Sequence, residues 1–244
     1  MRISGLICLI FGVDFMIDTI LWDVDGTLLD FHAAEYAAVK SLFSEFGYGK
    51  CSDDMIARYS EINDSFWKRL ERGEITKAQV LVGRFEQFFS EYGISTERVY
   101  EFNEKYQPRL GDTIVYCDDS YNIVKSLKGK VRQYAVSNGT VAAQTKKMKL
   151  SGFGVLLDGV FLSENIGSEK PNIGFFEKVF AKIQPVDKSK TIIVGDSLTS
   201  DMQGGINAGI KTCLYAPKGI NVPENMNIDY VIKDLCEIFD IIKL

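Results

Sequence analysis

The order of apolar and polar residues divides the chain into two kinds of segment. Short apolar runs bounded by glycine or polar residues occur near the start of the chain and again in its second half, whereas a long middle stretch has helical spacing. The predicted strands cover residues 17–22, 131–136, 160–162, 191–194, 211–215 and 229–232. The helices predicted among the later strands cover residues 119–127, 141–149, 173–183 and 234–242. This alternation predicts an α/β fold with parallel strands and right-handed crossovers.

The stretch between residues 29 and 112 is predicted to be wholly helical. Apolar residues recur there at helical spacing, and glycines or capping residues interrupt them at regular intervals. Four helices are expected: one ending before Gly47, one from the Ser52 cap to Gly73, one over residues 76–93 and one over residues 95–108. Thr76 and Gln79 have the spacing of a capping box at the start of the third helix.

Composition indicates a globular enzyme. The chain has 244 residues, 46% hydrophobic and 25% charged, which suffices for one α/β domain plus a smaller unit. The net charge is −5, and no Lys/Arg cluster with interleaved aromatic residues is visible, which argues against a nucleic acid polymer as partner. Five cysteines without CxxC spacing and a single histidine, His32, indicate neither a zinc site nor a disulfide framework.

Two acids follow the first predicted strand. Asp23 and Asp25 precede Gly26 where the apolar run breaks into a turn, so both carboxylates are expected at the carboxyl end of a buried strand. In open α/β sheets this edge is where ligands bind. One carboxylate can attack phosphorus while the other handles protons, and an attack on an anionic phosphate ester requires a cation, for which carboxylate oxygens favour Mg²⁺.

Three later segments supply complementary groups. The strand at 191–194 leads into Asp196 and Asp201, a second pair of acids. The strand at 131–136 leads into a hydroxyl and an amide ahead of a predicted helix, a pattern that suits phosphoryl oxygens. These are Ser137 and Asn138. Lys170 adds a positive charge before a proline that can open the next helix.

These four segments, in this order, resemble the four signature motifs of the haloacid dehalogenase superfamily of phosphohydrolases. The most specific are DxDGT after a strand and GDSxxxD more than 150 residues later. The resemblance implies a Rossmann-like parallel-sheet core with an inserted four-helix cap that closes over the crevice. It also implies that Asp23 is the nucleophile, which forms an aspartyl-phosphate, and that Asp25 is first the acid and then the base.

The same resemblance implies the remaining site roles. Asp23 and Asp196 would bind Mg²⁺ through their carboxylates and Asp25 through its backbone carbonyl, while Asp201 would act through water or as a partner of these ligands. The groups expected to hold the transferring phosphoryl oxygens are Ser137, Asn138 and Lys170. This division fits phosphoryl transfer, which needs positioning and charge neutralisation more than covalent chemistry from the protein.

Related activities remain alternatives. Dehalogenases of the superfamily share the core and cap, but they typically lack the second acid, so Asp25 favours phosphate chemistry. Phosphomutases keep both acids and stay open, as do sugar-phosphate and phosphoglycolate phosphatases. A non-catalytic signalling module phosphorylated on Asp, such as a response-regulator receiver domain, would use a similar core, Asp cluster and Lys, but it would lack the long helical insertion after the first strand.

Within the phosphatases, the helical segment resembles that of the pyrimidine 5'-nucleotidase group. The resembling segments are 63–67, 73–75 and 83–86 in the helical stretch and 204–209 in the core. The implied substrate is a small phosphate monoester, specifically a nucleoside monophosphate. Candidates for its recognition are Asn63 by hydrogen bonding, Trp67 by stacking and Arg84 by charge. The chain departs from the family at Asn172, where an acid is common.

The resulting organisation is a core domain of residues 16–29 and 112–244, a cap domain of residues 30–111 and an N-terminal extension of residues 1–15. The extension carries a short apolar segment behind Arg2, too short to span a membrane. We expect Met16 to be the physiological start and the enzyme to be cytoplasmic, with export of the chain as the alternative. A monomer or a homodimer is expected.

Overall fold

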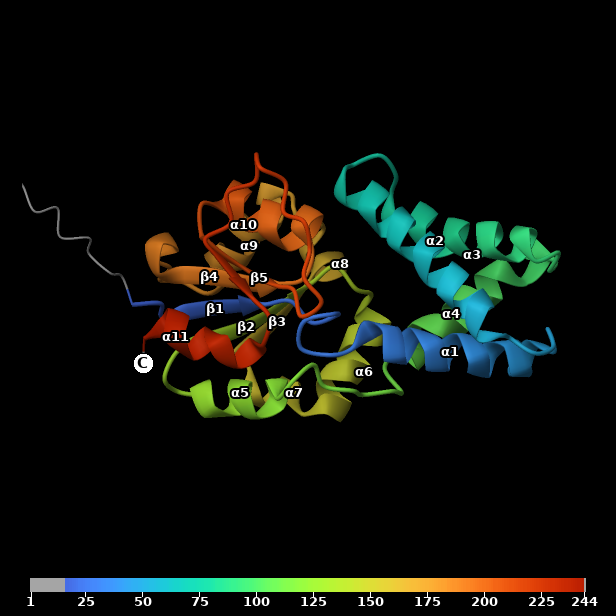
Figure 1. The fold of residues 1–244 in the computed structure, drawn as a ribbon, viewed down its shortest axis with the longest axis horizontal. Coiled ribbons are helices and arrows are strands. Elements are labelled where there is room, and N and C mark those ends of the chain that lie inside the picture. Colours follow the sequence, from blue (N-terminus) through green and yellow to red (C-terminus); the bar gives the residue numbers. More distant parts are fainter. Residues whose placement is uncertain (1–15, 244) are drawn as a thin grey trace, which may run out of the picture.

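In the computed structural model, which describes residues 16–243, the chain forms a parallel β-sheet with flanking helices and a bundle of helices beside it (Figure 1). The predicted extension, residues 1–15, lies outside the described residues. The predicted α/β class is confirmed, and the helical segment lies to one side of the sheet, beyond the carboxyl end of β1 (Figure 1).

The described chain contains one sheet of six parallel strands. In their order across the sheet, the strands are β3 (Gly159–Leu162), β2 (Arg132–Ser137), β1 (Thr19–Trp22), β4 (Thr191–Gly195), β5 (Lys211–Tyr215) and β6 (Tyr230–Ile232). Trp22 of β1 lies opposite Ala135 of β2 and Val194 of β4. The residues directly after β1 therefore lie near the ends of both neighbouring strands.

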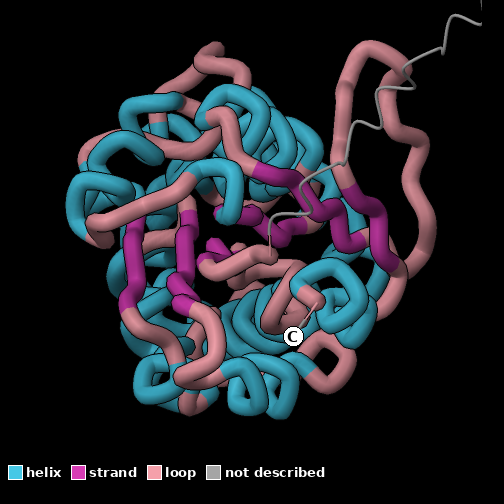
Figure 2. The backbone as a smooth tube through the Cα atoms, turned by 90° about the vertical axis from the view of Figure 1, so that its left-hand side faces the viewer, coloured by secondary structure: helices cyan, strands magenta, loops and turns pink. Residues whose placement is uncertain are grey.

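Helices cover both faces of the sheet (Figure 2), because successive side chains of a strand point to opposite faces. In β1, Ile20 and Trp22 pack into one buried apolar cluster, whereas Leu21 packs into the other. The first cluster lies under α5 (Ser120–Leu127), α7 (Phe153–Leu156) and α11 (Ile238–Ile242), and the second under α9 (Ile173–Lys182) and α10 (Gln203–Ala208). Strands buried on both faces are continuous apolar runs, which is why the pattern predicted them.

Several predicted bounds differ from the observed ones. The first strand begins at Thr19 instead of residue 17. Ile17 is buried but lies outside the strand, and an apolar pattern shows which residues are buried without showing which belong to the strand. The last predicted helix is a 3₁₀ turn, Leu235–Glu237, followed by α11. The elements α7, α8 (Ser163–Ile166), α10 and the π-helical turn Leu198–Met202 were not predicted, because they are too short to show a helical period.

The helical insertion, residues 30–111, contains the predicted four helices. They are α1 (Phe31–Phe46), α2 (Asp53–Glu71), α3 (Lys77–Glu91) and α4 (Val99–Arg109), with a 3₁₀ turn, Thr96–Arg98, before α4. The predicted capping box of Thr76 and Gln79 is confirmed at the start of α3. Aromatic side chains fill the bundle: the ring of Phe85 lies 5.0 Å from those of Tyr59 and Phe102. None of the helices within residues 16–243 has the length and apolar composition that a membrane crossing requires.

Two adjacent chain segments connect the insertion to the sheet. The Asp30 backbone N–H donates to the Val115 carbonyl at 2.8 Å, and that of Cys117 donates to the Leu28 carbonyl at 3.1 Å. The outgoing and returning chains therefore cross side by side, a few residues after β1. This places the insertion directly beyond the loop that carries Asp25.

Candidate active site

The acids predicted from sequence lie at the centre of the sheet's carboxyl edge. Asp23 follows β1, Asp196 follows β4, and Ser137 is the last residue of β2. The backbone N–H of Asp23 donates to the Val194 carbonyl at 2.9 Å, which holds the first acid against β4. Because strand order reverses between β1 and β4, the loops beyond these strands diverge and leave room for a ligand.

Three carboxylates converge at this edge. One oxygen from each of Asp23, Asp196 and Asp201 lies within 4.8 Å of the others. Asp201 reaches the group because a π-helical turn follows Ser197, whose backbone N–H donates to the Asp201 carboxylate at 3.2 Å. Carboxylates at this spacing can share one hard cation.

Lys170 supplies the positive charge among these acids. Its Nζ donates to an Asp23 oxygen at 2.7 Å, to an Asp201 oxygen at 2.6 Å and to the Val136 carbonyl at 2.8 Å. The three bonds satisfy every donor of the ammonium group. Burial alone would lower the pKa of Lys170, but Asp201 and Asp23 raise it above its usual value. The lysine therefore remains a cation at neutral pH.

One ammonium does not balance three carboxylates. Burial raises the pKa of Asp23 well above its usual range, against the opposing effect of Lys170. Burial and the nearby Asp201 raise the pKa of Asp196 to about 7, although part of the Asp196 side chain is accessible to solvent. Burial, together with repulsion between neighbouring carboxylates, thus disfavours the charged forms of these acids, and a divalent cation would favour them. The donor set, carboxylate oxygens within reach of one another, fits Mg²⁺.

Two glycines allow the acids to pack this closely. A Cβ atom on Gly26, whose φ is +89°, would lie 2.4 Å from an Asp196 oxygen. A Cβ atom on Gly195 would lie 2.3 Å from the Asp201 carboxyl carbon. Both contacts are shorter than van der Waals distance, so any larger residue at either position would displace an acid of the site.

Asp25 turns away from this cluster and toward α6 (Val141–Ser151). Gln144 donates to one Asp25 oxygen at 2.5 Å, and the Lys147 ammonium group donates to the other. Both side chains are buried, and Gln144 lies against Gly139, where a Cβ atom would be 2.4 Å from the amide nitrogen. The second acid thus has its own set of partners, separate from those of Asp23.

Ser137 and Asn138 lie beside Lys170. The Ser137 hydroxyl accepts a hydrogen bond from the Gly139 backbone N–H at 3.0 Å. The Asn138 carboxamide donates to the Lys170 carbonyl and accepts from the Lys170 backbone N–H, both at 2.8 Å. The Asn138 side chain therefore holds the lysine backbone in place. Because both ends of the carboxamide are used in this way, the Asn138 group that could contact phosphoryl oxygens is the backbone N–H.

The helical insertion contacts the core on two sides of the site. Glu71, at the end of α2, accepts hydrogen bonds from Thr199 and, at 3.5 Å, from Ser197. Lys77, at the start of α3, donates to the Ser163 hydroxyl at 3.0 Å and lies 3.4 Å from Glu164. Burial raises the pKa of Glu71 to about 7 and lowers the pKa of Lys77 against the opposing effect of Glu164.

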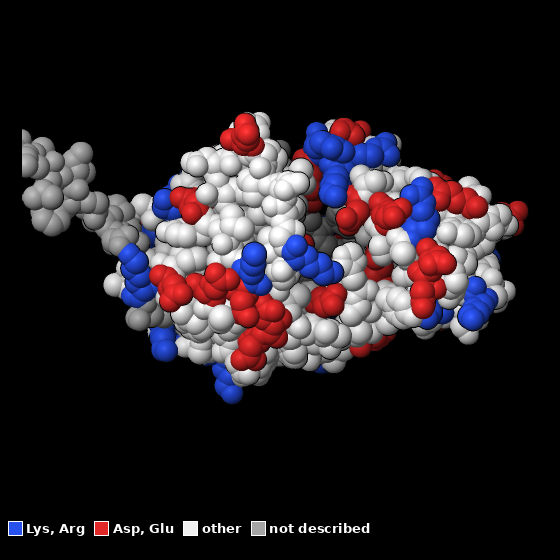
Figure 3. Space-filling model, viewed as in Figure 1, with Lys and Arg blue, Asp and Glu red and all other residues white. Residues whose placement is uncertain are grey.

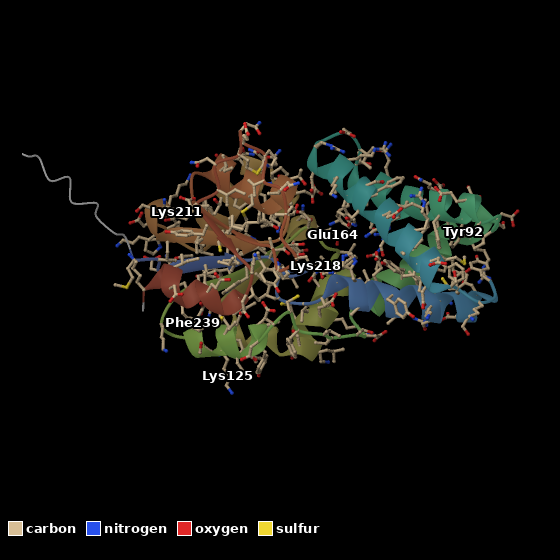
Figure 4. All side chains as sticks on the ribbon, viewed as in Figure 1. Tyr92, Lys125, Glu164, Lys211, Lys218 and Phe239 are labelled. Carbon is tan, nitrogen blue, oxygen red and sulfur yellow. The ribbon has the colours of Figure 1, made fainter. Side chains whose placement is uncertain are left out.

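The surface is hollowed between the core and the helical insertion, with charged side chains around the opening (Figure 3). Glu164 and Lys218 lie on the core side of the space between the two parts, whereas Tyr92 lies at the far end of the insertion (Figure 4). Thr199, which Glu71 of the insertion contacts, lies between Asp196 and Asp201 in the chain, so the cleft between the two parts adjoins the acid cluster.

The three residues expected to recognise substrate form one hydrogen-bonded group in the insertion. The Arg84 guanidinium donates to the Asn63 side-chain oxygen at 2.6 Å, and the Trp67 indole N–H donates to the same oxygen at 3.1 Å. Arg84 and Asn63 are each 1% exposed, whereas Trp67 is only partly buried. Only Trp67 of the three presents surface to a ligand in this conformation.

Four contributors to the site escaped the sequence analysis: Gln144, Lys147, Glu71 and Lys77. The first two are three residues apart and share a face of α6 with the buried Ala143 and Met148. Polar residues on the apolar face of a predicted helix were the available signal, since such residues need buried partners. The contacts of Glu71 and Lys77 depend on the placement of the insertion, for which the sequence carried no signal.

Most of the chain is similar to known proteins. Residues 20–215 match the model of the haloacid dehalogenase-like hydrolase family. HAD-hydrolase YfnB of Bacillus subtilis (strain 168) is 34% identical over 227 residues, which are 93% of this chain and 95% of YfnB. The crystal structure of YfnB bound to magnesium, which reveals interdomain movement, has a TM-score of 0.87 and 32% identity and covers 94% of this chain and 100% of that one.

A second relative has a more specific name. Pyrimidine 5'-nucleotidase PynA of Streptococcus pneumoniae (strain ATCC BAA-255 / R6) is 36% identical over 202 residues, which are 81% of this chain and 83% of PynA. The match therefore extends over most of both chains.

Proposed function

Because this chain belongs to the haloacid dehalogenase-like hydrolases, as its motifs predicted, we propose that it hydrolyses phosphate monoesters through a phosphorylated Asp23. The observation that carries the proposal is that the two acids have different hydrogen-bond partners. Asp23 is held by Lys170, whereas Asp25, two residues later, is held by α6. One carboxylate is thus placed to attack and the other to transfer protons.

The reaction proceeds in two steps. An Asp23 oxygen attacks phosphorus, the ester P–O bond breaks with its electron pair on the leaving oxygen, and that oxygen takes a proton from Asp25. Water then attacks the phosphorus and gives its proton to Asp25. Cleavage of the bond between phosphorus and the Asp23 oxygen releases inorganic phosphate and restores the carboxylate.

The other residues position and neutralise charge. We infer that Asp23, Asp196 and the Asp25 backbone carbonyl hold Mg²⁺, which would offset the negative charge of the phosphoryl group and the acids. Asp201 keeps Lys170 in place at 2.6 Å. Lys170, the Ser137 hydroxyl and the Asn138 backbone N–H would hold the phosphoryl oxygens, and little else is required of the protein in phosphoryl transfer.

Pyrimidine nucleoside monophosphates are the substrates we propose, and the helical insertion is the cap that encloses them. The name of PynA and the resemblance of segment 63–67 support this choice. Trp67 offers a partly exposed aromatic surface for stacking on a base, while Asn63 and Arg84 fix its orientation from inside the cap. The contacts of Glu71 and Lys77 would hold the cap down and limit the access of water.

The test is release of inorganic phosphate from a panel of nucleoside monophosphates, sugar phosphates and phosphoglycolate, with Mg²⁺ and with EDTA. Asp23→Asn should abolish turnover while the fold is retained, because a neutral amide cannot act as the nucleophile. Asp54→Asn, an exposed acid on α2, is the matched control and should remain active. Substantial activity of Asp23→Asn would refute the mechanism, and a preference for sugar phosphates would refute the substrate.

A further inference from the structure

We propose that Lys147 and Gln144 are positioning residues that aim the Asp25 carboxylate at the leaving oxygen of the substrate. The inference rests on the proposed phosphatase function, in which Asp25 transfers the proton. It adds two residues that neither the motifs nor the sequence analysis identified.

The geometry fixes both oxygens of Asp25 from one side. Lys147 donates to one oxygen and Gln144, at 2.5 Å, to the other. The donors are three residues apart, so they project from the same face of α6. A carboxylate held at both oxygens cannot rotate about its terminal bond without breaking a hydrogen bond. Each oxygen keeps a further lone pair for the proton that is transferred.

Burial shows that these contacts are specific. Lys147 and Gln144 are each 1% exposed, and among residues 16–243 the only carboxylate within ion-pair distance of the Lys147 ammonium is that of Asp25. A buried lysine is costly, and leucine or methionine would fill the same space without that cost. The lysine and the glutamine at this helix face therefore provide something that packing does not require: two donors for Asp25.

The surrounding residues are shaped to admit these donors. Gly139 lies under the Gln144 amide, since a Cβ atom there would come within 2.4 Å of its nitrogen. The Lys147 ammonium lies 5.3 Å from the centre of the ring of Phe31, which is the first residue of α1. The pair thus connects Asp25 to the loop after β2 and to the start of the cap.

If this proposal is correct, the effect of losing Lys147 or Gln144 on the rate of hydrolysis depends on the leaving group of the substrate. Alkoxide leaving groups, such as the ribose oxygen of a nucleotide, need a proton as the ester bond breaks, whereas nitrophenolate leaves without one. General acid catalysis contributes about 10²–10⁴-fold to such reactions. If Lys147 and Gln144 aim the acid, their loss should slow the hydrolysis of alkyl phosphates far more than that of nitrophenyl phosphate.

The experiment compares kcat/KM on a nucleoside monophosphate and on p-nitrophenyl phosphate for Lys147→Met, Gln144→Met and Lys147→Arg, because kcat/KM covers the steps up to departure of the leaving group and leaves out the later attack of water, which is common to both esters. Lys149→Met, an exposed lysine on the same helix, is the matched control. Lys147→Met should lose about 10²-fold on the nucleotide and less than about threefold on the nitrophenyl ester. Gln144→Met should show the same selectivity to a smaller degree, Lys147→Arg should recover most of the lost activity, and Lys149→Met should match the wild type.

Equal losses on both esters in a folded Lys147→Met protein would overturn the proposal, because a merely structural role affects both reactions. If Lys147→Met does not fold, as judged by thermal unfolding, Gln144→Met decides by the same comparison. Failure of the proposed function is a separate result: wild-type enzyme that releases no phosphate from either ester, or an active Asp23→Asn variant, refutes the phosphatase mechanism itself.

Discussion

The Nζ atom of Lys170 lies 2.7 Å from a carboxylate oxygen of Asp23, a residue 147 positions away along the chain. The same ammonium group binds Asp201, so one buried cation holds together acids that follow two different strands. Removal of one member of such a buried pair leaves uncompensated charge, which is more costly than the pair itself is stabilising. The stability of the protein and the order of its site are therefore linked at Lys170.

We expect Lys170→Met to lower the free energy of unfolding of the metal-free protein by about 3 kcal/mol or more, because Asp23 and Asp201 would face each other without a cation. Added Mg²⁺ should restore more stability to this variant than to the wild type. Thermal unfolding with EDTA and with Mg²⁺ measures both effects. Lys178→Met, a lysine on α9 outside the acid cluster, is the control, and equal losses in the two variants would contradict the account.

Gly26→Ala should disrupt the acid cluster, since its Cβ would approach an Asp196 oxygen to 2.4 Å. A displacement of about 1 Å at a catalytic group can cost about 10²-fold in rate, and we expect a loss of kcat of that order with weaker Mg²⁺ binding. Gly129→Ala separates this effect from backbone strain, because Gly129 also has a positive φ, +77°, but a Cβ atom there would meet no other atom within 4 Å. Similar kinetics for the two variants would refute the steric explanation.

The raised pKa of Glu71 leads us to expect that the stability of the protein depends on pH. Burial raises this pKa from 4.5 to about 7, so between these values the folded protein keeps a proton that the unfolded chain has released. Stability should therefore fall as pH rises from about 4.5 to about 7. Glu71→Gln should lack this loss and be more stable than the wild type at pH 8, by roughly 1–2 kcal/mol after allowance for partial exposure.

Chemical denaturation at a series of pH values tests the Glu71 prediction. Glu86→Gln, an exposed acid on α3, serves as the control. The stability difference between wild type and Glu71→Gln should grow across the stated pH window, and a constant difference would show that the Glu71 carboxyl does not titrate there.

Asp196 predicts proton release on binding of Mg²⁺. Its pKa of about 7 means that part of the metal-free protein carries a proton on this carboxyl at neutral pH. A metal ligand must be deprotonated, and burial also raises the pKa of Asp23, the other proposed carboxylate ligand, so apparent affinity for Mg²⁺ should rise with pH through about 7. Calorimetry in buffers of different ionisation enthalpy measures the released protons, and affinity that is independent of pH below 7 would disprove the expectation.

Trp67→Ala should raise the KM for a nucleoside monophosphate by about tenfold, since stacking on a base contributes about 1–3 kcal/mol. The KM for p-nitrophenyl phosphate should change much less, because that ester lacks the nucleoside. Steady-state kinetics of Trp67→Ala and of Tyr92→Ala, an aromatic residue at the far end of the insertion (Figure 4), provide the comparison. Equal changes on both esters would defeat the role of Trp67 in recognition.

Local patterns in the sequence determined the helices and strands and the positions of the acids at the ends of strands. Strands buried on both faces are apolar runs, and the residues that follow them must emerge at the sheet's edge, so Asp23, Ser137 and Asp196 could be placed from the pattern alone. The helical insertion could be predicted for a similar reason, because its buried aromatic side chains recur along the sequence at helical spacing. Only the shortest helices, such as α7 and α8, escaped.

Tertiary structure decided which side chains meet. Nothing local to Lys170 indicates that it binds both Asp23 and Asp201, nor to Asn138 that its carboxamide is used up by the Lys170 backbone. The partners of Asp25 on α6 and the contact between Glu71 and Thr199 depend on how distant segments pack. Periodicity records which face of an element is buried, but a contact between distant residues arises only when the whole chain has folded.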